Sequence, residues 1–329
     1  MKNVSLENLF KLKQNFENKR IAVLGDMMLD SYLWGSVKRI SPEAPVPVVE
    51  IEKEFTRFGG AANVALNIST LKGIPYPVGI IGYDSAGADF TSLLKEKNIS
   101  KEGIFISENR PTTIKTRVMA ENQHVVRVDK ESTDCISTEF ENSILEFFKK
   151  NISDLDAIIL EDYNKGILTE HIISEIIKLA NLNNKIITVD PKFHNFLQYK
   201  NVTVFKPNKK EAEDALGVKI TNNSEMEYAG KKLLDILNAK YILLTLGESG
   251  IALFEENGTV KKLPTKARKV ADVSGAGDTV ISTLTMALCA GADIYEAAFL
   301  ANWAGGIVCE TAGIIPIELN TLFETINEA

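Results

Sequence analysis

Short apolar runs recur along the chain, and glycine, proline or an acidic residue follows each one within two positions. The runs occupy residues 21–24, 78–81, 157–160, 186–189, 202–206 and 241–245. Apolar runs of this length that end in polar or turn residues are typical of strands buried on both faces. The pattern therefore predicts a set of short, fully buried strands.

Segments with helical periodicity separate these runs. They include residues 61–71, 90–94, 171–180, 209–216, 279–290 and 295–310. Strands that alternate with helices predict an α/β fold with a mostly parallel sheet wound on both faces. In such sheets, ligands bind beyond the carboxyl ends of the strands. We therefore expect the functional site among the polar and glycine-rich residues that follow the strands.

Two stretches interrupt this alternation. Residues 31–58 are rich in proline and in residues that favour strands, and residues 104–129 contain segments that alternate like half-exposed strands. We predict that strands within 31–58 and 104–129 form a second, smaller sheet outside the main layer. We find no repeat and no long linker, so we expect one domain over residues 1–329.

Composition narrows the classes of function. The chain has 329 residues, of which 45% are hydrophobic and 25% are charged, and its formal net charge is −7. An acidic chain without a basic tract is not expected to bind nucleic acid. No segment has the length and apolar character of a signal peptide or a membrane span. Three widely separated cysteines fit a reducing compartment, so we expect a cytoplasmic protein.

The segment 272–278, Asp-Val-Ser-Gly-Ala-Gly-Asp, directly precedes a predicted helix. The small residues Gly275, Ala276 and Gly277 let backbone N–H groups approach a ligand, and a helix start adds a positive dipole end. Asp278 at this anion site has the chemistry of a general base for phosphoryl transfer to an alcohol. The structural alternative is a capped turn in which Asp278 is the N-cap.

Asn208 and Glu211 lie three residues apart at another predicted helix start, so both side chains can face the first turn. Amide and carboxylate oxygens suit Mg²⁺, which usually keeps several of its waters. A capping pair at the helix N-terminus explains the same spacing. Both interpretations stay open on these two residues alone.

Three blocks together carry a family resemblance. They are Gly59-Gly60-Ala61-Ala62-Asn63, Asn208-Lys-Lys-Glu211, and the segment 272–278. In this order and at these separations, the chain resembles the ribokinase (PfkB-type) carbohydrate kinases along nearly its whole length. The resemblance implies a ribokinase-like fold with a β-sheet lid, ATP as phosphoryl donor, Mg²⁺ as cofactor, and a homodimer formed through the lid.

Further blocks narrow the resemblance to D-glycero-D-manno-heptose-7-phosphate kinases. They lie at residues 25–30, 39–48, 110–117, 162–166 and 190–192. Where that subgroup often has glycine in its Asp-Tyr-Gly-Lys-Gly motif, this chain has Asn164. The resemblance implies phosphorylation at C1 to the 1,7-bisphosphate, for ADP-heptose synthesis. Many of these enzymes carry a nucleotidyltransferase domain, and we expect this chain to be a stand-alone or excised kinase.

The resemblance also assigns roles to individual residues. Asp278 is the implied general base, and the amides of Gly275, Ala276 and Gly277 hold the transferring phosphoryl group. The implied sugar-binding residues are Asp30, Gly59, Gly60 and Asn63, and the candidate cations for the 7-phosphate are Lys115, Arg117, Lys165 and Lys192, with Arg39 and Arg127 behind them. The implied nucleotide-binding residues are Asn208, Thr245, Gly247, Ser249, Gly250 and Asn302. Asn208 and Glu211 are the implied Mg²⁺ site, and Asp272 and Ser274 match positions that can hold K⁺.

Each of these roles has a structural alternative. Asp30 fits a solvated loop carboxylate, the pair Gly59-Gly60 fits a tight turn, and Asn302 fits a helix surface. Each lysine or arginine also fits an ordinary surface charge.

For the whole chain, the alternatives are a kinase of the same fold for another sugar or nucleoside, a non-catalytic sugar or nucleotide sensor, and a dinucleotide-dependent oxidoreductase. The last lacks support, because no G-x-G-x-x-G follows the first apolar run.

Overall fold

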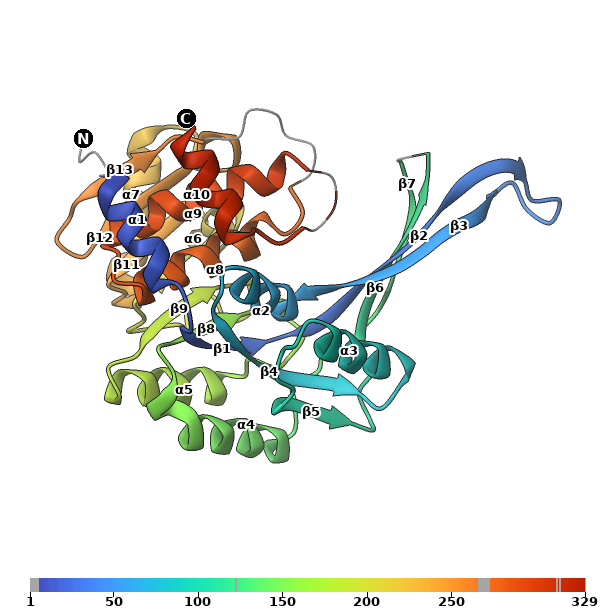
Figure 1. Ribbon diagram of the computed structural model, residues 1–329, viewed down its shortest axis with the longest axis horizontal. Coiled ribbons are helices and arrows are strands. Elements are labelled where there is room, and N and C mark those ends of the chain that lie inside the picture. The colour runs from blue at the N-terminus through green and yellow to red at the C-terminus, as the bar shows by residue number, and fades with distance from the viewer. Residues whose placement is uncertain (1–5, 122, 266–272, 312, 314, 329) are drawn as a thin grey trace.

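The computed structural model describes residues 6–121, 123–265, 273–311, 313 and 315–328, and it contains two sheets (Figure 1). Asp272 therefore lies outside the described residues. The main sheet has the strand order β13-β12-β11-β10-β9-β8-β1-β4-β5. The smaller sheet has the order β3-β2-β6-β7. The prediction of an α/β fold with a second sheet is confirmed.

The main sheet is parallel except at one edge. Its parallel strands are β1 (Arg20–Gly25), β4 (Ile74–Gly82), β5 (Gly103–Ser107), β8 (Ala157–Glu161), β9 (Ile186–Asp190), β10 (Val204–Phe205) and β11 (Tyr241–Thr245). At the edge, β12 (Ile251–Glu255) and β13 (Val260–Leu263) pair in the antiparallel sense. Six of these seven parallel strands coincide with or overlap the predicted apolar runs. The exception is β5, which lies in the stretch predicted to belong to the smaller sheet.

Helices cover both faces of this sheet, and the side chains of β1 show why. Ile21 and Val23 join one apolar cluster, whereas Ala22 and Leu24 join the other, because successive side chains of a strand point to opposite faces. The first cluster contains side chains of α1 (Leu6–Asn15), α2 (Ala61–Thr70), α3 (Ser85–Glu96), α8 (Ala276–Cys289), α9 (Ile294–Cys309) and α10 (Leu319–Asn327). The second contains side chains of α4 (Thr138–Asn151), α5 (Glu170–Leu182), α6 (Lys209–Leu216) and α7 (Asn223–Leu237).

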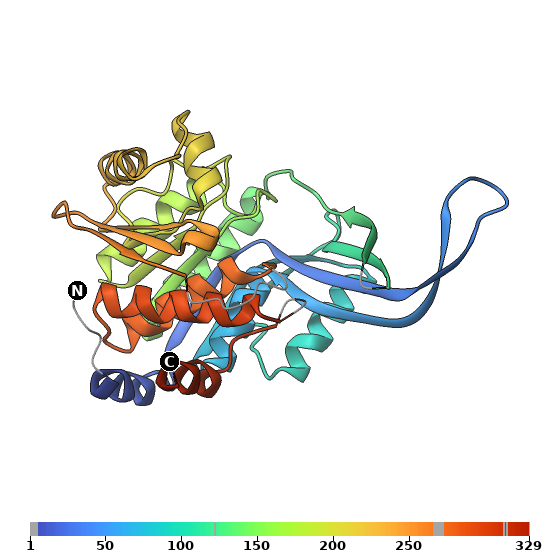
Figure 2. The same ribbon diagram turned by 90° about the horizontal axis from the view of Figure 1, so that it is seen from above.

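The smaller sheet continues directly from the main sheet. Strand β2 (Met27–Ile40) begins two residues after β1 and forms a long hairpin with β3 (Pro47–Gly60), which projects away from the body of the molecule (Figures 1 and 2). Strand β6 (Thr113–Ala120) pairs in parallel with β2, and β7 (Gln123–Lys130) completes the sheet. These strands extend beyond the predicted limits 31–58 and 104–129, and residues 103–107 lie at the edge of the main sheet instead.

Several elements were not anticipated from the sequence. The predicted elements do not include helices α1, α4, α7 and α10 or strands β12 and β13, and α8 begins three residues before the predicted start at residue 279. The short amphipathic helices α1 and α10 pack on each other near the ends of the chain. Among the described residues, no helix combines the length and the apolar character that crossing a membrane requires.

Candidate active site

The carboxyl ends of β8 and β9 meet the first turn of α8, and this junction is the centre of the site. Gly275 is the N-cap of α8 and has φ 79° and ψ −1°, a left-handed conformation that glycine adopts without strain. An α-helix leaves its first amide N–H groups without intrahelical acceptors. The amides of Ala276, Gly277 and Asp278 therefore start a helix at a point where an anion is favoured.

Asp278 is the third residue of α8, so the interpretation of this residue as an N-cap is wrong. Its side chain turns away from the backbone of its own helix and is only 4% exposed. Oδ2 accepts a hydrogen bond from Asn63 Nδ2 at 2.7 Å, and Oδ1 accepts one from Tyr163 Oη at 2.9 Å. The two bonds fix the orientation of the carboxylate while leaving further lone pairs on both oxygens.

The environment of Asp278 moves its pKa towards neutrality. Burial raises the pKa of Asp278 to about 6, and the negative charge of Asp190 acts in the same direction. The hydrogen bonds from Asn63 and Tyr163 and the charge of Lys206 oppose this rise. A carboxylate with a pKa near 6 is mostly ionised at neutral pH and is a stronger base than an ordinary aspartate.

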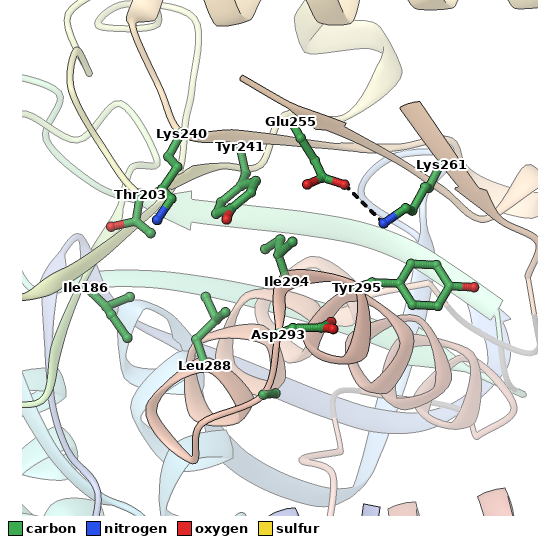
Figure 3. A pocket seen from close by; sticks show the side chains of 11 residues that line it. Ile186, Thr203, Lys240, Tyr241, Glu255, Lys261, Leu288, Asp293, Ile294 and Tyr295 are labelled. Atoms are coloured by element: carbon green, nitrogen blue, oxygen red, sulfur yellow. Dashed lines mark ion pairs between the residues drawn. The ribbon is translucent and has the colours of Figure 1, made fainter. Parts of the chain in front are cut away.

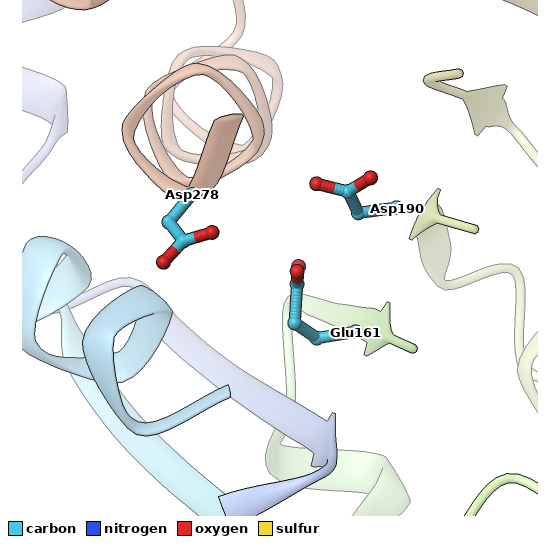
Figure 4. A group of neighbouring side chains, drawn as sticks. All are labelled: Glu161, Asp190 and Asp278. Atoms are coloured by element: carbon cyan, nitrogen blue, oxygen red, sulfur yellow. The ribbon is translucent and has the colours of Figure 1, made fainter. Parts of the chain in front are cut away.

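Two further carboxylates face Asp278. Glu161 ends β8 and Asp190 ends β9, and oxygen atoms of the three side chains lie within 4.8 Å of one another (Figure 4). The Lys206 ammonium lies 2.8 Å from Asp190 Oδ2 and is only 3% exposed. Lys192 adds a second positive charge 3.8 Å from Asp190 Oδ1. The cluster is thus a buried group of three acids with two lysines beside it.

Asn208 and Glu211 form a reciprocal capping box at the start of α6. Asn208 Oδ1 accepts the Glu211 N–H at 2.9 Å, and Glu211 Oε2 accepts the Asn208 N–H at 2.8 Å. Glu211 Oε1 accepts a hydrogen bond from Lys192 Nζ at 2.6 Å. The capping interpretation is therefore confirmed, and the pair also contacts the cluster through Lys192.

The predicted sugar-binding residues lie on the other side of Asp278. Asp30 is 3% exposed, so the interpretation as a solvated loop carboxylate is wrong. A Cβ atom at Gly59 would collide with the Asp30 carboxylate, and Gly60 has φ 54°. Asn63 lies in the first turn of α2, and its Oδ1 is buried without a hydrogen-bond partner among the described residues. The glycines thus allow the close approach of Asp30 and of the start of α2.

Three of the four candidate cations gather near Asp30. Lys115 pairs in register with Asp30 across β2 and β6, and Arg117, two residues on, forms an ion pair with the Asp30 carboxylate. Lys165 Nζ lies 2.7 Å from Glu131 Oε1. Burial lowers the pKa of Lys115, and the positive charge of the nearby Lys165 lowers it further. The fourth cation, Lys192, lies instead with Asp190 and Glu211.

The predicted nucleotide residues lie near the carboxyl end of β11. Thr245 forms an isolated parallel bridge with Asn208, which links this loop to the capping box. Gly247 and Ser249 belong to the short helix Gly247–Ser249, and Gly250 has φ 86°. A Cβ at Gly250 would collide with the Leu263 carbonyl.

Two other residues assigned from the resemblance lie on α9 and next to the start of α8. Asn302 on α9 is 7% exposed and donates from Nδ2 to the Pro264 carbonyl at 2.7 Å, so it is not a helix-surface residue. Ser274 directly precedes the Gly275 N-cap.

Comparison with known proteins identifies the family of this chain. A model of the pfkB family carbohydrate kinases matches residues 18–320. The chain belongs to this family. Membership makes it an ATP-dependent sugar kinase, and the glycine-rich start of α8 beside a buried carboxylate has the chemistry that such an enzyme needs.

Curated relatives share this sequence over most of its length. The bifunctional protein HldE of Desulfatibacillum aliphaticivorans is 43% identical over 303 residues, which are 92% of this chain and 62% of that protein. HldE of Helicobacter pylori strain J99 is 41% identical over 310 residues, or 94% of this chain and 67% of that protein. The chain therefore spans about two thirds of the length of these relatives.

Solved structures share the fold of this kinase at low sequence identity. Ribokinase of Arabidopsis thaliana, complexed with ribose and ATP, has a TM-score of 0.74 at 17% identity and covers 94% of this chain and 98% of its own. Phosphofructokinase-2 of Escherichia coli, in complex with potassium, has a TM-score of 0.77 at 17% identity and covers 94% and 99%. The ribokinase-like fold is confirmed.

The sequence motifs did not identify the residues that position Tyr163 and, through it, Asp278. Asp26, which is 1% exposed, accepts the N–H groups of Tyr163 at 2.7 Å and Lys165 at 3.1 Å. Burial raises the pKa of Asp26 to about 6. These bonds place Tyr163, whose hydroxyl holds the catalytic candidate Asp278. The available signal was position, since Asp26, Glu161 and Asp190 each lie at the end of a buried strand or one residue beyond it.

A cavity of about 480 Å³ lies at the opposite end of the main sheet (Figure 3). It is lined by residues at the amino ends of the strands, such as Ile186 and Tyr241, and by the start of α9 at Asp293 and Ile294. Lys261 and Glu255 form an ion pair of 3.1 Å at its side. None of the residues predicted for the kinase site lines this cavity.

Proposed function

We propose that this kinase domain phosphorylates D-glycero-D-manno-heptose 7-phosphate at C1 to give the 1,7-bisphosphate, for the synthesis of ADP-heptose for lipopolysaccharide core or S-layer. The observation that carries the proposal is the gathering of Lys115, Arg117 and Lys165 beside Asp30, at the sugar side of the site. A sugar that already bears a phosphate needs such cations. The relatives named HldE support the same assignment.

Asp278 acts as the general base in this reaction. It accepts the proton of the C1 hydroxyl, while the hydroxyl oxygen forms a bond to the γ-phosphorus of ATP and the bond from that phosphorus to the leaving ADP oxygen breaks. Tyr163 and Asn63 orient the base through the 2.9 Å and 2.7 Å hydrogen bonds. The amides of Gly275, Ala276 and Gly277 hold the negative charge of the phosphoryl group in transfer.

Asn208 and Glu211 are the proposed residues for Mg²⁺. Their oxygens already accept hydrogen bonds from the capping box and from Lys192, so they fit an ion that is held through its waters rather than by direct ligation. A bound Mg²⁺ neutralises charge on the phosphates of ATP. Ser274, together with Asp272, is proposed to hold K⁺, since hard oxygen ligands suit that ion.

The smaller sheet is proposed as a lid over the sugar and as the contact between two copies of the chain. The β2–β3 hairpin and the edge strand β7 expose apolar side chains, including Ile40 at 59%, Ile51 at 47% and Val128 at 57%. Exposed strands with apolar positions favour a partner that covers them. We therefore propose a homodimer through the lids, with residues 1–329 as a single kinase domain in each copy and the cytoplasm as its compartment.

A coupled assay of ADP release across a panel of sugars and sugar phosphates tests the substrate. We expect the highest kcat/KM with D-glycero-D-manno-heptose 7-phosphate and a ³¹P spectrum that shows a new phosphate on C1. The unphosphorylated heptose is the matched control for the cation cluster. An equal or higher kcat/KM with that sugar, with ribose or with fructose 1-phosphate would contradict the proposed substrate.

A further inference from the structure

Glu161 is a buried carboxylate for which the proposed mechanism has no use. It is the last residue of β8 and is 0% exposed, and neither carboxylate oxygen has a hydrogen-bond partner among the described residues. Its side chain points at Asp190 and Asp278 (Figure 4). An ionised carboxylate buried without donors is very unfavourable, so such a group requires a proton or a cation.

The charges around Glu161 decide between these two. The groups that face it are Asp190, Asp278, Tyr163, Lys192 and Lys206. Lys206 is bound to Asp190 at 2.8 Å and Lys192 to Glu211 at 2.6 Å, so both ammonium groups are engaged with other carboxylates. The positive charges of these two ammonium groups also disfavour a metal ion beside Glu161. Burial, followed by the charges of Asp190 and Asp278, raises the pKa of Glu161 well above its usual range.

We propose that Glu161 is a positioning residue that is protonated and neutral at neutral pH, and that its ionisation at alkaline pH weakens phosphoryl transfer by placing a negative charge against the glycine-rich start of α8. This inference rests on the proposed roles of Asp278 and of that helix start. With Glu161 neutral, Lys206 offsets Asp190, and Asp278 is the one uncompensated charge of this trio of acids. With Glu161 ionised, a second uncompensated charge is added.

The backbone at Gly277 connects this cluster to the proposed phosphoryl site. A Cβ atom at Gly277 would lie 3.5 Å from Asp190 Oδ2 and 3.6 Å from Lys206 Nζ. The amides proposed to hold the phosphoryl group therefore lie against the Asp190–Lys206 pair. A new negative charge within 4.8 Å of Asp190 counteracts Lys206 where the transferring group needs positive potential.

The test compares the pH profiles of kcat/KM for the wild type, Glu161→Gln and the control Glu255→Gln. Glutamine keeps the shape of Glu161 but stays neutral at every pH. Glu255 lies on β12, away from the site, and forms an ion pair with Lys261. We expect Glu161→Gln to leave the acid limb in place and to move the alkaline limb to higher pH by about one unit or more, because glutamine has no proton to lose at this position. Glu255→Gln should follow the wild type.

Infrared spectra of the wild type give a readout that needs neither a variant nor activity. With ¹³C-labelled glutamate, the wild type at neutral pH should show the carbonyl stretch of one protonated, buried glutamic acid, and Glu161→Gln should lack it. No such band in the wild type would overturn the proposal. So would an acid limb that moves to lower pH in Glu161→Gln, because it would mean that an ionised Glu161 raises the pKa of Asp278. A failure of Asp278→Asn to lower kcat would instead overturn the mechanism on which this inference rests.

Discussion

Strands β8 and β7 illustrate how differently the two sheets are built. All five residues of β8 are buried, and its last residue joins the cluster around Asp278. All eight residues of β7 are exposed, as are most residues in the distal part of the β2–β3 hairpin, from Lys38 to Glu54. Side chains locked in a packed core hold a fixed geometry, whereas an exposed sheet can shift or accept a partner.

This difference separates the proposed chemistry from the proposed recognition. The base and the phosphoryl site belong to the buried junction of the main sheet with α8. Of the three cations near Asp30, Lys115 and Arg117 lie on β6 of the smaller sheet, whereas Lys165 follows β8. Substitutions in the first region should lower kcat, and substitutions in the second should raise KM or change assembly.

The largest effect is expected at the base. Asp278→Asn should lower kcat by about 10²–10⁴-fold, the usual contribution of a general base, while ATP affinity changes little. Calorimetric titration with ATP and a thermal melt establish that the variant binds and folds. A folded variant with turnover near that of the wild type would remove Asp278 from the mechanism.

The cations of the smaller sheet should act on substrate binding instead. Lys115→Ala should raise KM for the sugar 7-phosphate by about 10- to 100-fold, the cost of one lost hydrogen bond to a charged group, and should leave kcat within a few-fold. Lys101→Ala, an exposed lysine outside the site, is the control. A comparable rise in KM for the unphosphorylated sugar would show that Lys115 does not contact the 7-phosphate.

The metal requirement should respond to the charge of Glu211. Glu211→Gln keeps the capping-box geometry, since glutamine also caps this position, but removes the negative charge. We expect the Mg²⁺ concentration for half-activity to rise by roughly 10-fold with little change in the melting temperature. Glu225→Gln makes the equivalent change at the start of α7, where Glu225 accepts from Thr221. An unchanged metal requirement in Glu211→Gln would leave that residue with a capping role alone.

Assembly should depend on the exposed strands and not on the body of the molecule. Val128→Glu places a charge on β7, where the side chain is 57% exposed, and should shift a dimer to monomers in light scattering. Leu182→Glu at the end of α5, which is 73% exposed, is the matched control and should stay dimeric. A wild type that is monomeric at micromolar concentration would contradict the dimer outright.

The sequence was sufficient for the parallel core because each buried strand is a short apolar run with a polar end. The buried positions of α7, among them Met226, Ala229, Leu233 and Leu237, do have helical spacing, so this helix could have been predicted by the same reasoning. Strand β5 could not, because it is adjacent in sequence to the smaller sheet but pairs with β4. Pairing partners depend on contacts between distant segments, which local pattern does not contain.

The site shows the same limit. The motifs led to Asp278 and to the helix start, but the spacing 208–211 fits both a capping box and a metal site, and the structure contains the capping box. Glu161 and Lys206 were missed because a position at or just after the end of a strand indicates the edge of the sheet where the site lies, but not which strand ends lie together. Their importance follows from the convergence of β8, β9 and α8, which tertiary structure alone creates.

The most direct test of the account is the pH dependence of phosphoryl transfer in a single turnover, measured by rapid quench for the wild type and Asp278→Asn. The pKa of Asp278 is raised to about 6, so protonation below that pH removes the base. The account predicts that the wild-type rate falls about tenfold for each pH unit below 6, and that the residual rate of Asp278→Asn lacks this dependence. An acid limb that persists unchanged in Asp278→Asn would contradict the assignment of Asp278 as the base.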